Sequence, residues 1–477
     1  MKLLNFILLV FGLGAVSAAN YNYSEVIGLS LLFYEAQRTG VLPPTNRIPW
    51  RKDSFVTDIG QNGEDLTGGY FDAGDHVKFG FPAAGTMTLL AWGMYDSKRG
   101  YEIAGEWMNA LDCLRWGMDY MIKTHPSANV LYIQVGDTVE DHNYWGRPEE
   151  WTGSNPRPTI RATTLLPSSE CAAEQSAAMA AASMVFKENG ETAYGATLLM
   201  HAEQLYSFAT TYRGNNNDSF PGITYSSWSG YGDEFLWAAA WLYRATGREQ
   251  FKEDCNRFWT EFDLSVRPKE VSWDNKLAGA QVLLAKIDGS PKYVTAARNF
   301  CDWVVKEAPK TPLGLVYLDQ WGSARHAANA AFVCLQAASA DINTDEDYIA
   351  FAKTQIDYVL GDYGRSLVVG YGLNPPQQPH HRAASCPDLP ATCSFTDAFL
   401  PGPNPQILYG ALVGGPDIND EYEDDRSDYV RNEVALDYNA GFQSALANLN
   451  LIYNQGSISG TSLLTGAVGI VVILLLR

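Results

Sequence analysis

Hydrophobic residues recur at helical spacing over most of the chain, and alternating strand patterns are rare. Ala, Leu and aromatic residues carry this pattern in segments 174–186, 194–212, 233–246, 276–287, 294–307, 325–338, 348–360 and 438–452. Gly and Pro separate the segments, as at Gly190, Gly222 and Pro312. The pattern therefore predicts an all-α protein.

Some of these helices are apolar on every side, as in the run Leu-Trp-Ala-Ala-Ala-Trp-Leu over residues 236–242. A helix of this kind is buried, which favours two layers of helices in an α/α toroid, although a solenoid has the same periodicity. Between Tyr21 and Tyr453 we find no Ser/Pro-rich linker and no long charge run. We therefore expect one domain over residues 20–455.

Composition narrows the possible partners. The formal net charge is −20, and an acidic surface repels phosphate backbones, so nucleic acid is excluded as a partner. The chain also holds 13 Trp and 26 Tyr. Most such rings pack in cores, but rings exposed in a groove can stack on sugars.

Both ends of the chain predict an extracellular route. Residues 1–19 read as a signal peptide, with Lys2, an apolar run over 6–16 and small residues before the cleavage site. The sequons at Asn22 and Asn217 fit glycosylation, although such triplets also arise by chance. The tail 456–477 is hydrophobic but short for a bilayer span, which favours a GPI signal over a transmembrane anchor.

The chain has seven cysteines, an odd number, so at least one is free or paired between chains. Cys386 and Cys393 flank a short Pro-containing loop and are the expected disulfide. No Cys/His spacing indicates a zinc site.

Two carboxylates, Asp72 and Asp75, lie three residues apart around Gly74 in the loop 68–78. Glycine allows the loop to turn sharply and to direct both side chains at one point. Mutual repulsion would raise one pKa and leave the other group ionised, as a catalytic base and its helper require. A calcium-binding loop or a plain Asp-Gly turn is the alternative.

Two later segments add to this loop. Glu433 lies between an aromatic and an apolar run, where partial burial would raise its pKa towards that of a general acid. Its alternative is a solvated acidic loop at a helix start. His380 and Arg382, on a Pro-stiffened loop, can donate hydrogen bonds to hydroxyls, whereas a metal site would lack a third ligand.

Taken together, these motifs resemble glycoside hydrolase family 9, the endoglucanases, over almost the whole mature chain. The Asp72–Asp75 loop, the Pro-His-x-Arg element at 379–382 and the late element at 422–440 occur in the family's order. The resemblance implies an (α/α)6 barrel of six helical hairpins and hydrolysis of internal β-1,4-glucosidic bonds in cellulose-type glucans with inversion. It makes Asp75 the general base, Asp72 its helper and Glu433 the general acid.

Inverting glycosidases separate their two carboxyl groups by roughly 6.5–9.5 Å. We expect that spacing between Asp75 and Glu433. The resemblance also implies a set of sugar-binding residues, which are His142, Trp145, Trp228, Trp321, Arg325, His380, Arg382 and Tyr429. Core packing is the alternative for the tryptophans.

No cofactor is expected for the chemistry. The segment 226–234 resembles a calcium loop of family members, and oxygen ligands suit that cation. Its ligands would be Ser229, Gly230, Asp233, Glu234 and Asp274. The partners expected are a β-1,4-glucan and, through the tail, a membrane, with the protein itself a monomer.

Other functions remain open at this stage. The enzyme could act on another β-glycan, such as mixed-linkage glucan, xyloglucan or an amino-sugar polymer. A non-catalytic carbohydrate-binding protein on the same scaffold would have lost a carboxylate, yet Asp72, Asp75 and Glu433 are all present. For a purely structural surface protein, three separate catalytic-type motifs would be a coincidence.

Overall fold

The computed structural model describes residues 21–342 and 347–473, with side chains described up to residue 454. In these ranges, six helices pack side by side in a closed inner ring in which each contacts the next and the last contacts the first. The ring consists of α2 (Gly80–Asp96), α6 (Ser169–Glu188), α9 (Gly232–Thr246), α11 (Leu277–Ile287), α13 (Ser323–Ala338) and α17 (Leu436–Ile473). Nearly every described residue of these helices is buried, as the apolar pattern predicts.

Each inner helix follows an outer helix with one polar face. The outer layer consists of α1 (Tyr23–Ala36), α4 (Trp107–Thr124), α7 (Thr192–Thr211), α10 (Glu249–Glu261), α12 (Pro291–Lys306) and α14 (Tyr348–Asp357). Six outer–inner pairs make the (α/α)6 barrel, which confirms the all-α toroid and excludes the solenoid. Alanine-rich stretches of α6 and α13 allow the inner helices to approach closely.

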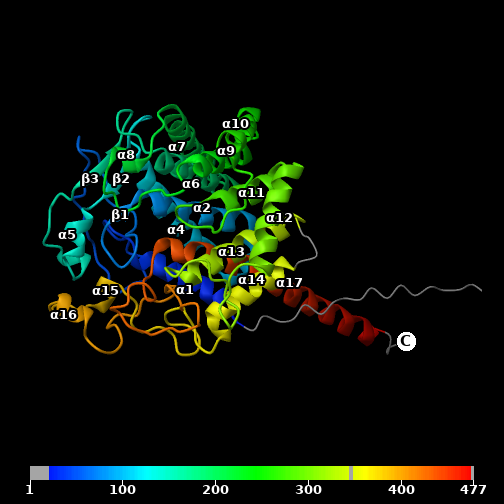
Figure 1. Cartoon of the computed structure of the whole chain (residues 1–477). Helices are drawn as coiled ribbons and strands as arrows, with labels where there is room; N and C mark the ends of the chain where they lie inside the picture. The colour runs from blue at the N-terminus through cyan, green and yellow to red at the C-terminus, as the bar shows by residue number, and fades with distance from the viewer. Residues whose placement is uncertain (1–20, 343–346, 474–477) are drawn as a thin grey trace, which may run out of the picture.

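Every inner helix runs in the same direction, because each one returns from an outer partner. Their N-terminal ends, and the loops that precede them, therefore meet at one end of the barrel. On this side lie a three-stranded antiparallel sheet and several short helices (Figure 1). These elements are β1 (Lys78–Phe79), β2 (Leu131–Val135), β3 (Thr159–Ala162), α5 (Thr138–His142), α8 (Asn216–Ser219), α15 (Arg382–Ser385) and α16 (Phe395–Ala398).

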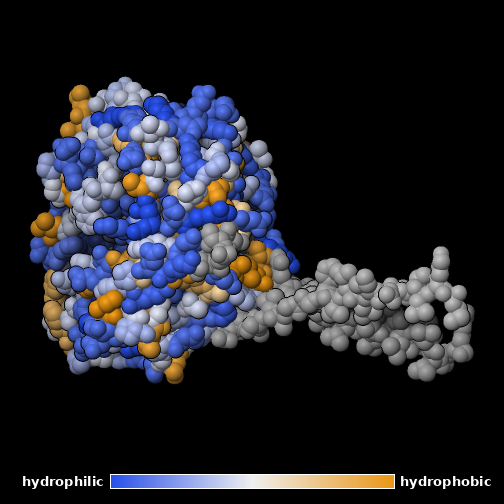
Figure 2. All heavy atoms as spheres, turned by 45° about the vertical axis from the view of Figure 1, so that its right-hand side comes forward, coloured by the Kyte–Doolittle hydropathy of each residue, from blue (hydrophilic) through white to orange (hydrophobic). Residues whose placement is uncertain are grey.

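Three further segments complete the secondary structure of the described ranges. They are α3 (Lys98–Ala104), a 3-10 turn at Pro148–Glu150 and a π-helical turn at Tyr358–Asp362, which ends α14. The surface in Figure 2 is mostly hydrophilic with scattered apolar residues, as expected for a chain of net charge −20.

The predicted Cys386–Cys393 disulfide is present. A second bridge joins Cys301 of α12 to Cys334 of α13, a pairing that the sequence did not reveal. The remaining cysteines are buried thiols at Cys113, Cys171 and Cys255.

The two terminal predictions fall largely outside the described residues. The signal peptide 1–19 lies wholly outside them, and of the tail 456–477 only the backbone of α17, up to Ile473, is described. Within the described part of the chain, no helix combines the length and the hydrophobicity needed to cross a bilayer.

Candidate active site

The three sequence motifs come together at the N-terminal end of the inner helices. The amide of Leu436, at the start of α17, donates to the carbonyl of Asp72 at 2.8 Å. The amide of Arg382 donates to the carbonyl of Gly74 at 3.1 Å. Backbone bonds thus hold the Asp72–Asp75 loop against both later motifs.

Gly74 is required for this contact. A Cβ atom at Gly74 would lie 2.3 Å from the carbonyl oxygen of His380 and 2.8 Å from the Cα of His381, which is too close for any side chain. The His380 amide in turn donates to the carbonyl of Asn432 at 2.8 Å, next to Glu433. The loop carrying His380 therefore lies between the Asp72–Asp75 loop and Glu433.

Asp72 is buried and accepts a hydrogen bond from the hydroxyl of Tyr225 on Oδ2. Burial raises the pKa of Asp72 well above its usual range, and the nearby charge of Asp75 raises it further. Asp72 thus holds a proton more readily than an ordinary aspartate does. Tyr225 was not predicted as a site residue.

Asp75 keeps a small opening to solvent, with 11% of its side chain exposed. Its Oδ2 lies 3.8 Å from Nε2 of His142, and its Oδ1 has no hydrogen-bond partner among the described residues. Oδ1 itself is buried, so the exposed part of the side chain lies elsewhere. A carboxylate oxygen without a protein donor is suited to accept a proton from a water molecule that reaches it.

Asp141 and Arg382 form a buried ion pair next to Asp75. Arg382 contacts the Asp141 carboxylate through Nη1, and the amide of His76 donates to the same carboxylate at 3.1 Å. Burial, followed by the charge of Asp75, raises the pKa of Asp141 to about 6. Asp141 directly precedes His142 in the sequence, but only the fold reveals its partner.

Glu433 is half-buried immediately before α17. Its Oε2 accepts hydrogen bonds from Nε1 of Trp321 at 2.5 Å and from the hydroxyl of Tyr438 at 3.0 Å. Burial raises the pKa of Glu433 to about 7, with a smaller contribution from Asp437, although the two hydrogen bonds oppose the shift. The Glu433 side chain is therefore partly desolvated and does not lie in a freely solvated loop.

Comparison with known proteins places this arrangement in a family. The model of glycosyl hydrolase family 9 matches residues 23–446. The chain belongs to this family. It is therefore a glycoside hydrolase, as the motifs predicted.

Individual relatives support the assignment. Endoglucanase B of Cellulomonas fimi is 45% identical over 455 residues, which are 91% of this chain but only 43% of that protein. The structure of an endoglucanase from the termite Nasutitermes takasagoensis superimposes with a TM-score of 0.88 at 50% identity, covering 91% of this chain and 99% of the termite chain. An endoglucanase from Clostridium thermocellum complexed with cellotriose has a TM-score of 0.79 at 35% identity, covering 91% and 71%.

An aromatic row lines the site of this family 9 enzyme next to Glu433. The Trp321 ring lies 5.6 Å from the Tyr429 ring, Tyr429 lies 6.2 Å from His380, and His380 lies 5.4 Å from Trp145. Trp321 is 41% exposed and Tyr429 is 53% exposed, so both can contact a ligand. Trp145 is only 7% exposed, so its main role is to pack against the ring of His380.

A second aromatic group lies next to Asp72. Trp228 is 78% exposed, and its ring packs 5.3 Å from that of Trp273. Trp273 lies 4.7 Å from Tyr225, the residue that donates to Asp72. Ring contacts and one hydrogen bond thus link the exposed indole of Trp228 to the Asp72–Asp75 loop. An exposed ring in this position is a suitable stacking surface for a sugar.

Two arginines from the predicted sugar-binding set are engaged inside the protein. Arg325 is buried and donates to Asp437 at 2.7 Å. Arg382 is buried with Asp141, as described above. In the structure both guanidinium groups therefore hold site carboxylates in place, whereas His142, with 55% of its side chain exposed, is accessible to a ligand.

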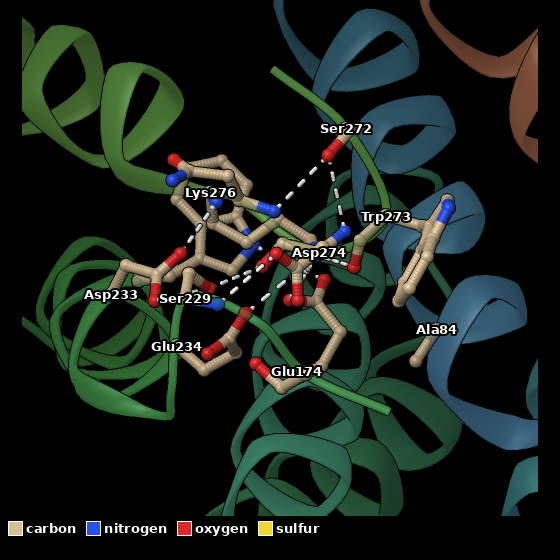
Figure 3. A network of polar contacts seen from close by, with 12 residues as sticks. Ala84, Glu174, Ser229, Asp233, Glu234, Ser272, Trp273, Asp274 and Lys276 are labelled. Atoms are coloured by element: carbon tan, nitrogen blue, oxygen red, sulfur yellow. Dashed lines mark hydrogen bonds and ion pairs between the residues drawn. The ribbon is translucent and has the colours of Figure 1, made fainter. Parts of the chain in front are cut away.

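Two clusters of acidic side chains are candidates for metal binding. Among the described residues, Asp75, Asp141 and His142 place one potential ligand atom each within 4.8 Å of one another, but Asp141 already pairs with Arg382. The predicted calcium residues form the second cluster, and Figure 3 shows the side chains of Ser229, Asp233, Glu234 and Asp274 close to Glu174 and Lys276.

In this second cluster, the ammonium group of Lys276 lies near the acidic side chains. Its Nζ lies 3.5 Å from Glu174 and 3.8 Å from Glu234. Both carboxylate oxygens of Glu234 are buried without a hydrogen-bond partner in the described part of the chain. Buried oxygens of this kind fit a hard cation.

Proposed function

We propose that this family 9 enzyme is an endo-β-1,4-glucanase that cleaves internal bonds of cellulose-type glucans with inversion of configuration. The names of its relatives support the substrate class, and one of the solved relatives holds cellotriose. Two exposed aromatic surfaces can stack on sugar rings, one around Trp228 near Asp72 and one around Trp321 at Glu433.

In the proposed mechanism, Asp75 takes a proton from water as the water oxygen attacks the anomeric carbon. Asp72 helps to hold that water. Glu433 gives its proton to the glycosidic oxygen as the carbon–oxygen bond breaks. One proton enters the protein at Asp75 and one leaves at Glu433, so the charge of the pair is conserved.

The protonation of Glu433 carries this proposal. A pKa of about 7 means that the group keeps its proton in mildly acidic solution, where an ordinary glutamate with a pKa of about 4.3 is ionised. The same site presents Asp75 with an unpartnered oxygen. An acid and a base with different surroundings are what inverting hydrolysis requires.

Release of reducing ends from carboxymethyl-cellulose tests the roles. We expect Asp75→Ala and Glu433→Gln to lower kcat by at least about a hundredfold, the usual contribution of one acid or base. Glu307→Gln, on the exposed end of α12, is the matched control and should keep full activity. Normal rates in either site variant would refute the roles, and a parallel panel of mixed-linkage glucan and xyloglucan would identify another preferred β-glycan.

Stereochemistry gives an independent test. We expect the Asp75 and Glu433 carboxyl groups to be separated by roughly 6.5–9.5 Å and the first product to be the α-anomer. Proton NMR of cellohexaose hydrolysis during the first minutes distinguishes the anomers. An initial β-anomer would mean retention and would contradict the assignment of a base.

We also propose a structural calcium ion at the second acidic cluster. Burial, and then the neighbouring Asp233, raises the pKa of Glu234 well above its usual range, so the cluster lacks positive charge that a divalent ion would supply. The ligands would be Ser229, Gly230, Asp233, Glu234 and Asp274. Chelation should lower the thermal midpoint of the wild type and not of Glu234→Gln. Equal midpoints with and without chelator in the wild type would exclude the ion.

Finally, we propose secretion and a C-terminal membrane tether. Two disulfides fit an oxidising compartment, and Asn22 and Asn217 are both exposed, as glycosylation requires. Phospholipase treatment of cells should release the protein if the tail is exchanged for a lipid anchor. Protein that stays on the membrane would favour a transmembrane tail.

A further inference from the structure

The two carboxyl oxygens of Glu433 have different surroundings. Oε2 accepts two hydrogen bonds, from the Trp321 indole and from the Tyr438 hydroxyl. Among the described residues, no protein donor contacts Oε1. The asymmetry matters because a carboxylic acid carries its proton on one oxygen only.

The chemistry of the two donors indicates which oxygen that is. An indole N–H can only donate, so Oε2 must offer it a lone pair in both protonation states of Glu433. In a protonated carboxyl group, the carbonyl oxygen is a better acceptor than the hydroxyl oxygen. Two donors on Oε2 therefore favour the form in which Oε2 is the carbonyl and Oε1 carries the proton.

We propose that Trp321 and Tyr438 are positioning residues that keep the proton of Glu433 on Oε1, the oxygen left free to reach the leaving group. This inference rests on the proposed role of Glu433 as general acid. It gives Trp321 a second task besides contact with sugar, and it assigns a task to Tyr438, which the sequence motif contained without explanation.

Tyr438 is fixed in the orientation that this role requires. The residue is buried, and the Arg325 guanidinium lies 5.0 Å from the centre of its ring while donating to Asp437 at 2.7 Å. Gly322 leaves the space for the phenol, because a Cβ there would lie 3.0 Å from Tyr438 Cζ. Gly322 also has φ of +74°, a conformation that favours glycine.

Trp321 is also fixed, by hydrogen bonds of its backbone and by packing of its ring. Its amide donates to Asp319 at 2.7 Å, and its carbonyl accepts from Arg325 at 3.1 Å. Its ring packs against Tyr429. Arg325 thus contacts both donors, which couples their positions.

The same contacts assist the transfer itself. As the O–H bond at Oε1 breaks and the proton moves to the glycosidic oxygen, negative charge spreads over both oxygens of Glu433. Donors already in place on Oε2 stabilise that charge without rearrangement. Because they stabilise the ionised form, they also hold the pKa of Glu433 below the value that burial alone would produce.

Leaving-group dependence separates this role from a structural one. Cellohexaose needs a protonated leaving group, whereas the dinitrophenolate of a dinitrophenyl cellobioside departs without one. We expect Tyr438→Phe to lower kcat on cellohexaose about tenfold and to change the rate on the dinitrophenyl substrate by less than about twofold. Trp321→Phe should lower kcat on cellohexaose by more than it lowers the rate on the dinitrophenyl substrate, where only the loss of its sugar contact is felt. The basic limb of the pH–rate profile on cellohexaose should rise by about one pH unit for each lost donor.

A matched control removes a buried phenol far from the site. Tyr206 of α7 donates to Asp254 at 2.6 Å, and Tyr206→Phe should leave both rates and the pH profile unchanged. Equal losses on both substrates without a shift of the basic limb would show that the two donors act only through the fold, and the inference would fail. Wild-type enzyme inactive on cellohexaose would instead refute the proposed function, and this inference with it.

Discussion

The buried pair Arg382–Asp141 allows the sharpest test of how the site is held together. Only 7% of the Arg382 side chain and 3% of the Asp141 side chain are exposed. Removing one partner of such a pair leaves an uncompensated charge and costs about 3–5 kcal/mol of unfolding free energy. That is a large share of the roughly 5–15 kcal/mol that holds a typical domain folded.

We therefore expect Arg382→Met to lower the unfolding free energy at neutral pH by about 3–5 kcal/mol. The double variant Arg382→Met/Asp141→Asn should recover a large part of this loss, since neither side chain of the pair is then charged. Arg248→Met is the control, because its pair with Glu203 is about 40% exposed on both sides and such pairs contribute less than about 1 kcal/mol.

The loss of unfolding free energy in Arg382→Met should depend on pH. The pKa of Asp141 is about 6 in the folded state and about 3.9 in an unfolded chain, so folding favours its protonated form and this group destabilises the fold as pH rises. Arg382 lowers that pKa, and its loss would raise it further. The penalty of Arg382→Met should therefore be largest above the raised pKa of Asp141 in the variant and should shrink as pH falls to about 6, the pKa of Asp141 in the wild type.

Guanidinium unfolding followed by tryptophan fluorescence at pH 5 and pH 8 measures both effects. If Arg382→Met unfolded at the wild-type midpoint at pH 8 and only raised KM, the side chain would be a sugar ligand and not a structural partner of Asp141. That result would restore the role that sequence resemblance implied and refute the reasoning from burial.

Three further predictions follow from single observations. First, kcat/KM should fall above about pH 7 as Glu433 loses its proton, since the acid acts only when protonated; a rate that stayed level up to pH 9 would contradict the pKa. Second, Trp228→Ala should raise KM for long glucans several-fold with little change in the unfolding midpoint, because the ring is 78% exposed; a lower kcat with unchanged KM would exclude sugar stacking. Third, replacing Cys301 and Cys334 by Ala should cost about 3–4 kcal/mol through loss of a cross-link between residues 33 apart; calorimetry showing no change would mean that the thiols are unpaired.

Much of the barrel could be predicted from the sequence, because helical periodicity records which face is buried. The segment 325–338 lies within α13, and 276–287 differs from α11 by one residue. Both are inner helices with several buried faces, where the pattern is strongest. None of the three strands was predicted. β1 and β3 have only two and four residues, and the five residues of β2 are all buried, so none of them shows a readable alternation.

The site could be predicted only as far as its motifs extend along the chain. Asp72, Asp75 and Glu433 are each followed by the start of an inner helix, α2 or α17, and the fold brings these starts together. Partners from other hairpins were out of reach, because nothing in the sequence connects Tyr225 with Asp72 or Cys301 with Cys334. Such pairings arise from the closure of the ring and not from local pattern.

Gly74 shows why the motif and the fold depend on each other. In the sequence it is a small residue between two aspartates, which suggests only a tight turn. In the structure its φ is not positive, so the turn itself would tolerate a side chain. What excludes one is the backbone of His380 and His381, which lies within 3 Å of where a Cβ would be. The glycine is therefore needed for the contact between two motifs some three hundred residues apart, and that contact connects the Asp72–Asp75 loop, through His380, to Asn432 beside Glu433.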